Sequence, residues 1–213
     1  MKATMTTTRR FLLPAFALLM FGPALAGPLD PPGVPAPTGV TLQQIYDAIK
    51  PPGCFNNNPS GLRFVDCGNG TVQDVQSGLV WLKNANCLTG GSSDWASANR
   101  RASKLADGSV DGNTCGLADG SKAGMWRLPT QAEWQAIVLA FPTACNPALP
   151  DATGAGCYTT GAWATSVQSG RYWSSSAYTP DPIIGYYGDA GVGGVNIASK
   201  TNNYFVLPVR TGP

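Results

Sequence analysis

The sequence has no histidine among its 213 residues and only one glutamate, Glu133. A chain without histidine lacks the usual general base, the commonest zinc ligand and every Ser-His or Cys-His nucleophile pair. Charged residues of both signs make up 12% of the chain, which is about half the usual share. These absences exclude most hydrolase mechanisms, and we expect that the protein is not an enzyme.

Long apolar runs are also absent. The longest run, over residues 11–21, follows a basic start and precedes the small-x-small sequence Ala24-Leu25-Ala26, a pattern that predicts a signal peptide over residues 1–26. No other stretch approaches the ~20 apolar residues that cross a bilayer. We therefore expect an exported chain without a transmembrane span, located in the periplasm, on the cell surface or outside the cell.

Strong charge of one sign is missing once the leader is removed. The leader takes with it three of the 14 basic residues and none of the 12 acidic residues, which leaves a net charge of −1. A chain with so little positive charge gives no electrostatic reason to expect a nucleic acid partner.

Cysteine is present in an even number, and every cysteine lies after the leader. An even count in an exported chain predicts three disulfides, although six cysteines allow 15 pairings. Zinc is disfavoured because the chain has neither a CxxC spacing nor a histidine. We predict the sequential pairs Cys54–Cys67, Cys87–Cys115 and Cys145–Cys157.

Two segments precede the expected globular domain, which spans residues 54–213. Residues 27–40 contain five prolines and predict a stiff, extended spacer. Residues 41–50 predict a short amphipathic helix that begins with a capping box. A helix this short is marginal alone, so it either packs on its own domain or associates with other copies, for instance in a homo-trimer.

The rest of the chain predicts an α+β domain with small antiparallel sheets, two helices and long loops. A β-hairpin is expected over residues 71–74 and 79–82, and the glycine-rich residues 107–124 are expected to form a loop. The expected helices run from Asp94 to about Ala106 and from Thr130 to about Phe141, and further strands are expected over 172–175 and 204–210.

The candidate binding region is residues 176–203, which we expect to form ligand-binding loops. Tyrosine combined with serine, glycine and asparagine is typical of adaptable recognition loops, in which rings make contact and amides make hydrogen bonds. For a sugar ligand, the tyrosines would stack and the other side chains would form hydrogen bonds. The candidate residues are Tyr178, Tyr186, Tyr187, Asp189, Asn196, Asn202 and Asn203.

Calcium is an additional candidate ligand. Asp107, Asp111, Asn113 and Asp119 lie close together in the sequence and could form an oxygen cage. They do not match the EF-hand spacing, and Asp-Gly is also an ordinary turn dipeptide. Both interpretations stay open, and no other cofactor is expected.

Four motifs occur in order between residues 64 and 210. Together they resemble the C-terminal domain family of the collagen-like adhesin Lcl, whose pattern has threonine where this chain has serine at position 77. Residues 127–134 also resemble a signature of the formylglycine-generating enzymes. The motifs are Gly70-Thr-Val-x-Asp74 with Ser77-Gly-Leu-x-Trp81, then Trp126-Arg127-Leu-Pro-Thr130 with Glu133, then Tyr172-Trp173-Ser-Ser175, and finally Val209-Arg210.

The resemblance implies a C-type-lectin-like fold, which both groups share. In that fold two helices flank small antiparallel sheets, the N- and C-terminal strands pair, and a long loop region forms the ligand surface. The resemblance then assigns structural roles to Trp81, Trp126, Arg127, Glu133 and Trp173.

The resemblance also implies a function. The Lcl domain resembles an adhesin module that trimerises and recognises sulfated glycans, so we expect an adhesin-like module that binds a glycan or a protein on a cell surface. The alternative is a structural subunit of a surface filament or envelope complex. Formylglycine generation is not expected, because it needs a late cysteine pair that holds copper, and the last cysteine here is Cys157.

Overall fold

The computed structural model describes residue 41 and residues 61–88, 91–140 and 143–212. The predicted signal peptide, the spacer and the predicted helix over 41–50, apart from Thr41, lie outside the described residues, as does Cys54. The chain divides into two units, Met1–Thr41 and Leu42–Pro213. All described helices and strands belong to the second unit.

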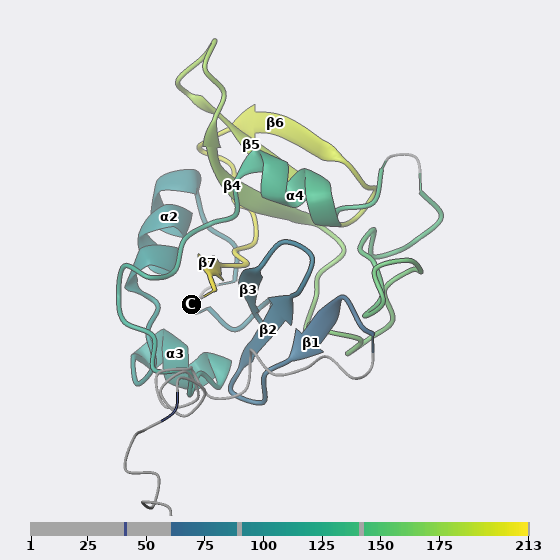
Figure 1. Ribbon diagram of the computed structural model, residues 1–213. Coiled ribbons are helices and arrows are strands. Elements are labelled where there is room, and N and C mark those ends of the chain that lie inside the picture. Colours follow the sequence, from purple (N-terminus) through teal and green to yellow (C-terminus); the bar gives the residue numbers. More distant parts are fainter. Residues whose placement is uncertain (1–40, 42–60, 89–90, 141–142, 213) are drawn as a thin grey trace, which may run out of the picture. The chain divides into compact units, whose positions relative to one another are not determined.

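The first sheet has four antiparallel strands in the order β1-β2-β3-β7 (Figure 1). The predicted hairpin is confirmed as β2 and β3, which pair from Thr71↔Leu82 to Gln73↔Val80. Gly78 ends the connecting turn with φ 72°, a conformation that glycine adopts without strain. The strands are β1 (Phe64–Asp66), β2 (Thr71–Asp74), β3 (Leu79–Leu82) and β7 (Val209–Thr211).

The C-terminal strand differs from the expected residue range and from the strand pairing that the resemblance implies. It covers only Val209–Thr211 rather than residues 204–210, because residues 204 and 205 make single bridges elsewhere, Tyr204 with Ser93 and Phe205 with Tyr172. The segment therefore passes from one sheet to the other instead of running along one. Strand β7 pairs with β3, so the terminal strands β1 and β7 lie at opposite edges and are not paired as the resemblance implied.

The second sheet has three antiparallel strands, β4 (Arg171–Ala177), β5 (Ile184–Asp189) and β6 (Val195–Ser199). The expectation that residues 176–203 form a loop region is therefore wrong, since β5 and β6 form a hairpin within it. Glycine usually weakens a strand, but here two glycines make room for large neighbours. A Cβ at Gly188 would lie 2.6 Å from the Trp134 ring, and one at Gly185 would lie 3.1 Å from Trp95.

Three helices are described, one more than predicted for residues 54–213. Helix α2 (Trp95–Lys104) begins at the predicted cap, where the Asp94 side chain accepts a hydrogen bond from the Ser97 backbone N–H. Helix α3 (Val110–Cys115) lies where a loop was predicted, and the Ser109 side chain caps it. Helix α4 (Gln131–Ile137) has the predicted capping box but ends before Phe141, at C-cap Val138.

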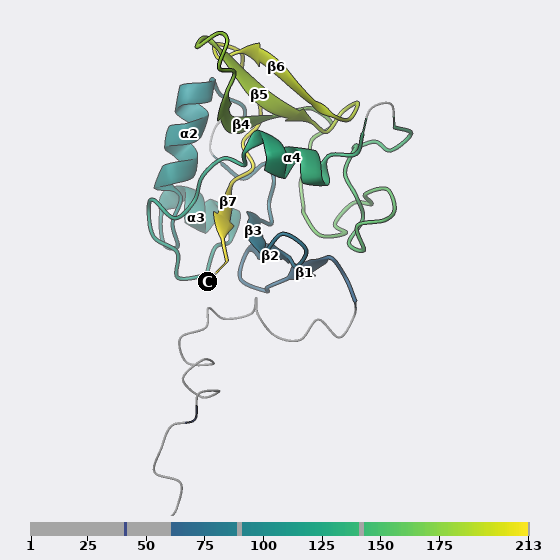
Figure 2. The same ribbon diagram turned by 45° about the horizontal axis from the view of Figure 1, so that its top comes forward.

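Large aromatic side chains from β3, β4, α4 and the segment before α4 form much of the core. Trp81, Trp126, Trp134 and Trp173 are at most 1% exposed. The rings of Trp81 on β3 and Trp134 on α4 lie 5.7 Å apart, so the first sheet and the helix over the second sheet share one core. Figures 1 and 2 show α4 lying across the second sheet.

Two of the predicted disulfides are confirmed. Cys87 is bonded to Cys115 and Cys145 to Cys157, and Cys67 is also disulfide-bonded. The first bond ties the end of α3 to the segment that follows β3, and the second lies in the long segment between α4 and β4. No described helix has the length and apolar character needed to cross a membrane.

Candidate ligand-binding site

The predicted binding residues do not form one site, because the β5–β6 hairpin sends them to opposite faces of the second sheet. Successive residues of a strand point to opposite sides, so Tyr186 and Tyr187 cannot act on the same surface. Gly188 faces Trp134 of α4, and Gly185 faces Trp95 of α2. We call the side of Gly188 and Tyr186 the α4 face, and the side of Gly185 and Tyr187 the Tyr204 face.

The α4 face carries two of the candidate tyrosines. The ring of Tyr178 meets that of Tyr186 edge to face at a centroid distance of 5.8 Å. Tyr186 is paired with Ile197 of β6, whose exposed fraction is 43%. Both tyrosines are half-buried, so their rings are only partly accessible to a ligand.

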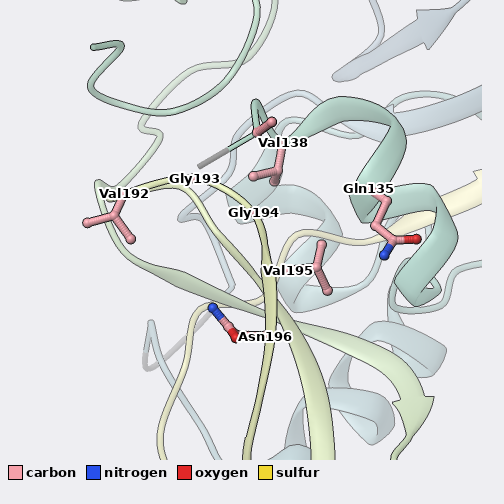
Figure 3. Close-up of a pocket in the computed structure, with 8 residues that line it drawn as sticks. Gln135, Val138, Val192, Gly193, Gly194, Val195 and Asn196 are labelled. Atoms are coloured by element: carbon pink, nitrogen blue, oxygen red, sulfur yellow. The ribbon is translucent and has the colours of Figure 1, made fainter. Parts of the chain in front are cut away.

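An open cavity of about 610 Å³ lies beside the end of α4 and the start of β6. In Figure 3, Val195 and Asn196 point to opposite sides of β6, as the strand period requires. The lining is aliphatic apart from two amides, and no charged side chain belongs to it. The lining residues are Gln135, Val138, Ala140, Val192, Gly193, Gly194, Val195 and Asn196.

The Tyr204 face is built around Arg171 at the start of β4. The guanidinium carbon of Arg171 lies 5.2 Å from the centre of the Tyr187 ring and 5.6 Å from that of Tyr204. Nη1 of Arg171 donates to the Tyr204 hydroxyl at 3.2 Å, and Nε donates to Asp189 Oδ2 at 3.4 Å. We call Arg171, Tyr187, Asp189, Asn202 and Tyr204 the Arg171 cluster.

The cluster holds an accessible cation over a buried aromatic floor. The Arg171 side chain is 50% exposed, whereas Tyr187 is 6% and Tyr204 9% exposed. No hydrogen bond among the described residues uses Nη2 of Arg171, so that nitrogen can donate to a ligand. The Tyr187 ring lies beneath the guanidinium and supports it, so it offers no open face for the sugar stacking that the sequence suggested.

The ionisation states in the cluster favour recognition of negative or polar groups. The hydrogen bond to Tyr204 and the electrostatic influence of Tyr187 and Tyr204 raise the pKa of Arg171 above its ordinary value. Burial raises the pKa of Tyr187, which keeps its hydroxyl neutral at physiological pH. The cluster therefore carries a permanently charged donor beside a neutral Tyr187.

Among the remaining candidates, Asp189, Asn196 and Asn202 lie on or beside the same face. Asn196 lies opposite Tyr187 in the β5–β6 register and is exposed, as are Asn202 and Asn203. The Asn202 amide donates to the Tyr204 hydroxyl at 3.1 Å. The Asp189 carboxylate accepts from the backbone N–H groups of residues 191 and 192, so this acid mainly holds the turn before β6.

Sequence reasoning missed Arg171 and did not select Tyr204 as a site residue. The available signal was the period of the strands. Arg171 and Trp173 are two residues apart on β4, and Arg171 pairs with Asp189 and Trp173 with Tyr187. All four therefore share one face, which a prediction of loops could not reveal.

The calcium candidates have different structural surroundings and do not point to a common ligand. Asp119 is buried and pairs with Arg210 at 3.2 Å, while its other oxygen accepts from Ser121. Asp107 accepts from the Gly120 backbone N–H, and Asp111 and Asn113 lie on α3. Within the part of the chain that the structure describes, no three His, Cys, Asp or Glu residues gather as a metal site.

The motif residues make hydrogen bonds and core contacts that hold the fold together. Arg127 donates two hydrogen bonds to the Glu133 carboxylate, at 2.7 and 2.6 Å, while Glu133 closes the capping box by accepting from the Thr130 N–H. The indole N–H of Trp126 donates to Ser121. That of Trp173 donates to the Ser93 carbonyl, and Trp81 lies in the core.

Comparison with known families gives one match. The sequence model described as the Lcl C-terminal domain matches residues 70–210, which are about two thirds of the chain. No curated protein matches the chain. The matched range includes the three described helices, strands β2 to β6, the first two residues of β7, and the whole Arg171 cluster.

Proposed function

Because the chain belongs to the Lcl C-terminal domain family, we propose that it is an exported, adhesin-like binding domain that recognises a glycan or another surface ligand through the Arg171 cluster. The proposal includes the finer expectation that the α+β fold is C-type-lectin-like and related to that of the formylglycine-generating enzymes. Confirmed disulfides are consistent with an oxidising compartment outside the cytoplasm.

The observation that carries the proposal is the exposed guanidinium of Arg171, fixed over two tyrosine rings. A buried or fully paired arginine would serve the fold alone, but half of this side chain is exposed. Its contact with Asp189 is long at 3.4 Å. An arginine held in place by rings loses less conformational freedom on binding, which favours affinity.

The chemistry of the cluster suits an oxygen-rich ligand. A guanidinium donates paired hydrogen bonds to a carboxylate or sulfate, and the exposed amides of Asn196, Asn202 and Asn203 can donate to or accept from hydroxyls. A sugar that carries an acidic group combines both requirements. Tyr178 and Tyr186 lie on the α4 face and are not part of this proposed site.

The same cluster is poorly equipped for catalysis, which supports a binding role. Burial raises the pKa of Tyr187 and so keeps its hydroxyl neutral, and the carboxylate of the cluster, Asp189, is engaged by Arg171 and by backbone N–H groups. Ser174, Ser175 and Ser176 lie nearby on β4, but the chain has no histidine to activate them.

A broad glycan array tests the proposal, with neutral, carboxylated and sulfated chains printed side by side. The disulfide-bonded chain should give selective signals on acidic glycans. Parallel incubations with calcium and with a chelator decide whether Asp107 and its neighbours contribute. A blank array from folded protein would contradict glycan binding and would favour the alternative of a structural subunit.

A further inference from the structure

The Cys145–Cys157 disulfide is the more accessible of the two cysteine pairs that the structure describes. Cys157 is exposed and Cys145 is half-buried. Cys87 and Cys115, by contrast, are 7% and 5% exposed and belong to the hydrophobic core. A thiolate reduces a disulfide by direct attack on one of its sulfurs, so access limits the reaction. Cys157 is therefore the cysteine that a reductant in solution reaches first.

The Cys157 side of this disulfide is well supported by the fold. Residues Pro150 and Cys157 form a β-bridge, and the Tyr158 N–H donates to the Leu149 carbonyl. The indole N–H of the buried Trp163 donates to the Pro150 carbonyl at 2.9 Å. None of these contacts uses a sulfur atom, so they keep Cys157 in place after the disulfide is broken.

The Cys145 side has weaker attachments among the described residues. The Cys145 N–H donates to the Thr143 hydroxyl, which lies in the same short segment. The next hydrogen bond along the chain is at Asn146, whose Oδ1 accepts from the Ser169 hydroxyl. Asn146 is exposed, and such a bond contributes little because water competes for both partners. Breaking the disulfide therefore releases residues 143–146.

The segment that follows Cys145 bridges the start of β4 and the end of β5. The Asn146 side chain holds Ser169, which lies just before β4. The Ala148 N–H donates at 2.8 Å to the carbonyl of Ala190, the residue after β5. The disulfide thus fixes a segment that contacts two strands distant from it in the sequence.

These two strand ends carry the Arg171 cluster. Arg171 pairs with Asp189 in the β4–β5 register, and the neighbouring Ala190 N–H donates to the Gly170 carbonyl at 2.8 Å. The bridge from Cys145 follows directly on the residues that reduction releases. Breaking the disulfide therefore loosens this pairing and, with it, the position of the Arg171 guanidinium.

We propose that Cys157 is a site of thiol–disulfide exchange and that the Cys145–Cys157 disulfide is a redox switch for the Arg171 cluster. The co-reactant is a dithiol reductant. One of its thiolates attacks the Cys157 sulfur, forms a mixed disulfide and displaces the Cys145 thiolate. Its second thiol then releases Cys157 and closes the reductant's own disulfide. Two electrons and two protons pass from the dithiol to this protein.

The switch has two parts with different premises. Selective reduction rests on the exposure of Cys157 and on the burial of Cys87 and Cys115. The effect on binding also rests on the proposed function, because it requires a ligand of the Arg171 cluster. Two of the following measurements need no ligand, so they separate the two premises.

Reduction of the folded protein tests the first part. The disulfide-bonded chain is incubated with increasing dithiothreitol, alkylated with iodoacetamide and mapped by mass spectrometry. Cys145 and Cys157 should be alkylated at lower dithiothreitol than Cys87 and Cys115, and the difference should vanish in denatured protein. Alkylation of all four cysteines together in the folded protein, or of Cys87 and Cys115 first, would overturn the proposal.

Amide hydrogen exchange then measures the loosening without a ligand. The two cysteines are 12 residues apart, and after selective reduction the Ala148 and Ala190 amides should exchange about 10- to 100-fold faster, the upper limit set by the closure of a loop of this length. The Leu82 amide, which bonds to the Pro208 carbonyl, is the control and should not change. Unchanged exchange at Ala148 and Ala190, or equal acceleration at Leu82, would overturn the switch.

The glycan array tests the link to binding. Cys145→Ser combined with Cys157→Ser mimics the reduced state and should bind the acidic glycan about 10-fold more weakly, since a loosened cluster is competent for a smaller fraction of the time. Ala155→Ser changes an exposed residue of the same loop, leaves the disulfide intact and should bind like the wild type.

Reversibility distinguishes a switch from damage, since reduced wild-type protein that is reoxidised should regain its binding. Undiminished binding by the double variant, beside a wild type that binds, would overturn the link to the Arg171 cluster. A wild type that binds no glycan would contradict the proposed function, whereas selective reduction and faster exchange in the same protein would still support the redox site.

Discussion

Asp74 lies at the end of β2, and its carboxylate is completely buried. Arg63 donates to it twice, at 3.0 and 2.9 Å. The Gln76 backbone N–H and the Ser77 hydroxyl donate at 3.0 and 2.8 Å. This aspartate therefore holds Arg63, the residue directly before β1, and the β2–β3 turn at the same time, which gives a physical reason for its place in the family motif.

The substitution Asp74→Asn keeps the shape and removes the charge. Breaking a buried ion pair by removing one partner costs about 3–5 kcal/mol, because the remaining charge is left uncompensated. The Arg63 side chain is 13% exposed and can regain some water, so we expect the lower limit, about 3 kcal/mol. For a domain of this size that corresponds to a fall in Tm of about 6–12 °C.

Urea unfolding of the oxidised protein measures this loss, and Asp66→Asn on the neighbouring strand is the control. Asp66 pairs with Lys83, but the two side chains are 49% and 33% exposed, and pairs of this kind contribute at most about 1 kcal/mol. Equal losses for the two variants, or a loss below about 1 kcal/mol for Asp74→Asn, would refute the reasoning.

Two further predictions concern α4. Gly188→Ala should cost about 1–3 kcal/mol of unfolding free energy through overpacking, because its Cβ would lie 2.6 Å from Trp134. Gly185→Ala should cost less, because its Cβ would lie 3.1 Å from Trp95. The reverse order of the two losses in urea unfolding would contradict this packing. Burial acts to raise the pKa of Glu133, but hydrogen bonds from Arg127 and Thr130 outweigh it and lower the pKa below 4.5. The resulting stabilisation is present above about pH 4.5 and is lost as the pH falls through the folded-state pKa. Glu133→Gln should therefore lose less stability than the wild type on acidification, and parallel pH profiles of unfolding would show that this carboxylate contributes nothing.

The parts of the fold that the sequence predicted are those set by local chemistry. The cap at Asp94 and the capping box of Thr130 and Glu133 depend on residues three positions apart, so they can be recognised from the sequence alone. Helix α3 was missed because its six residues include a glycine and polar side chains. The Cys87–Cys115 bond and the Ser109 cap compensate for that weak helical propensity.

The candidate site was predicted in composition but not in arrangement. Gly185 and Gly188 suggested loops, whereas tertiary packing against Trp95 and Trp134 uses their missing side chains to form a strand. Once β5 is a strand, Tyr186 and Tyr187 must separate to opposite faces. Arg171 lies outside the stretch rich in tyrosine and asparagine, and only the pairing of β4 with β5 brings it to the cluster.

The central claim is that Arg171 binds the ligand, and the most direct test compares three proteins on the same glycan array. Arg171→Gln removes the charge and should weaken binding of the acidic glycan by about 10- to 100-fold, the effect expected for losing hydrogen bonds from a charged donor. Arg100→Gln removes an exposed arginine of α2 that bonds only to Ser97 among the described residues, and it should bind like the wild type. Undiminished binding by Arg171→Gln, or equal losses in both variants, would contradict the assignment of the site.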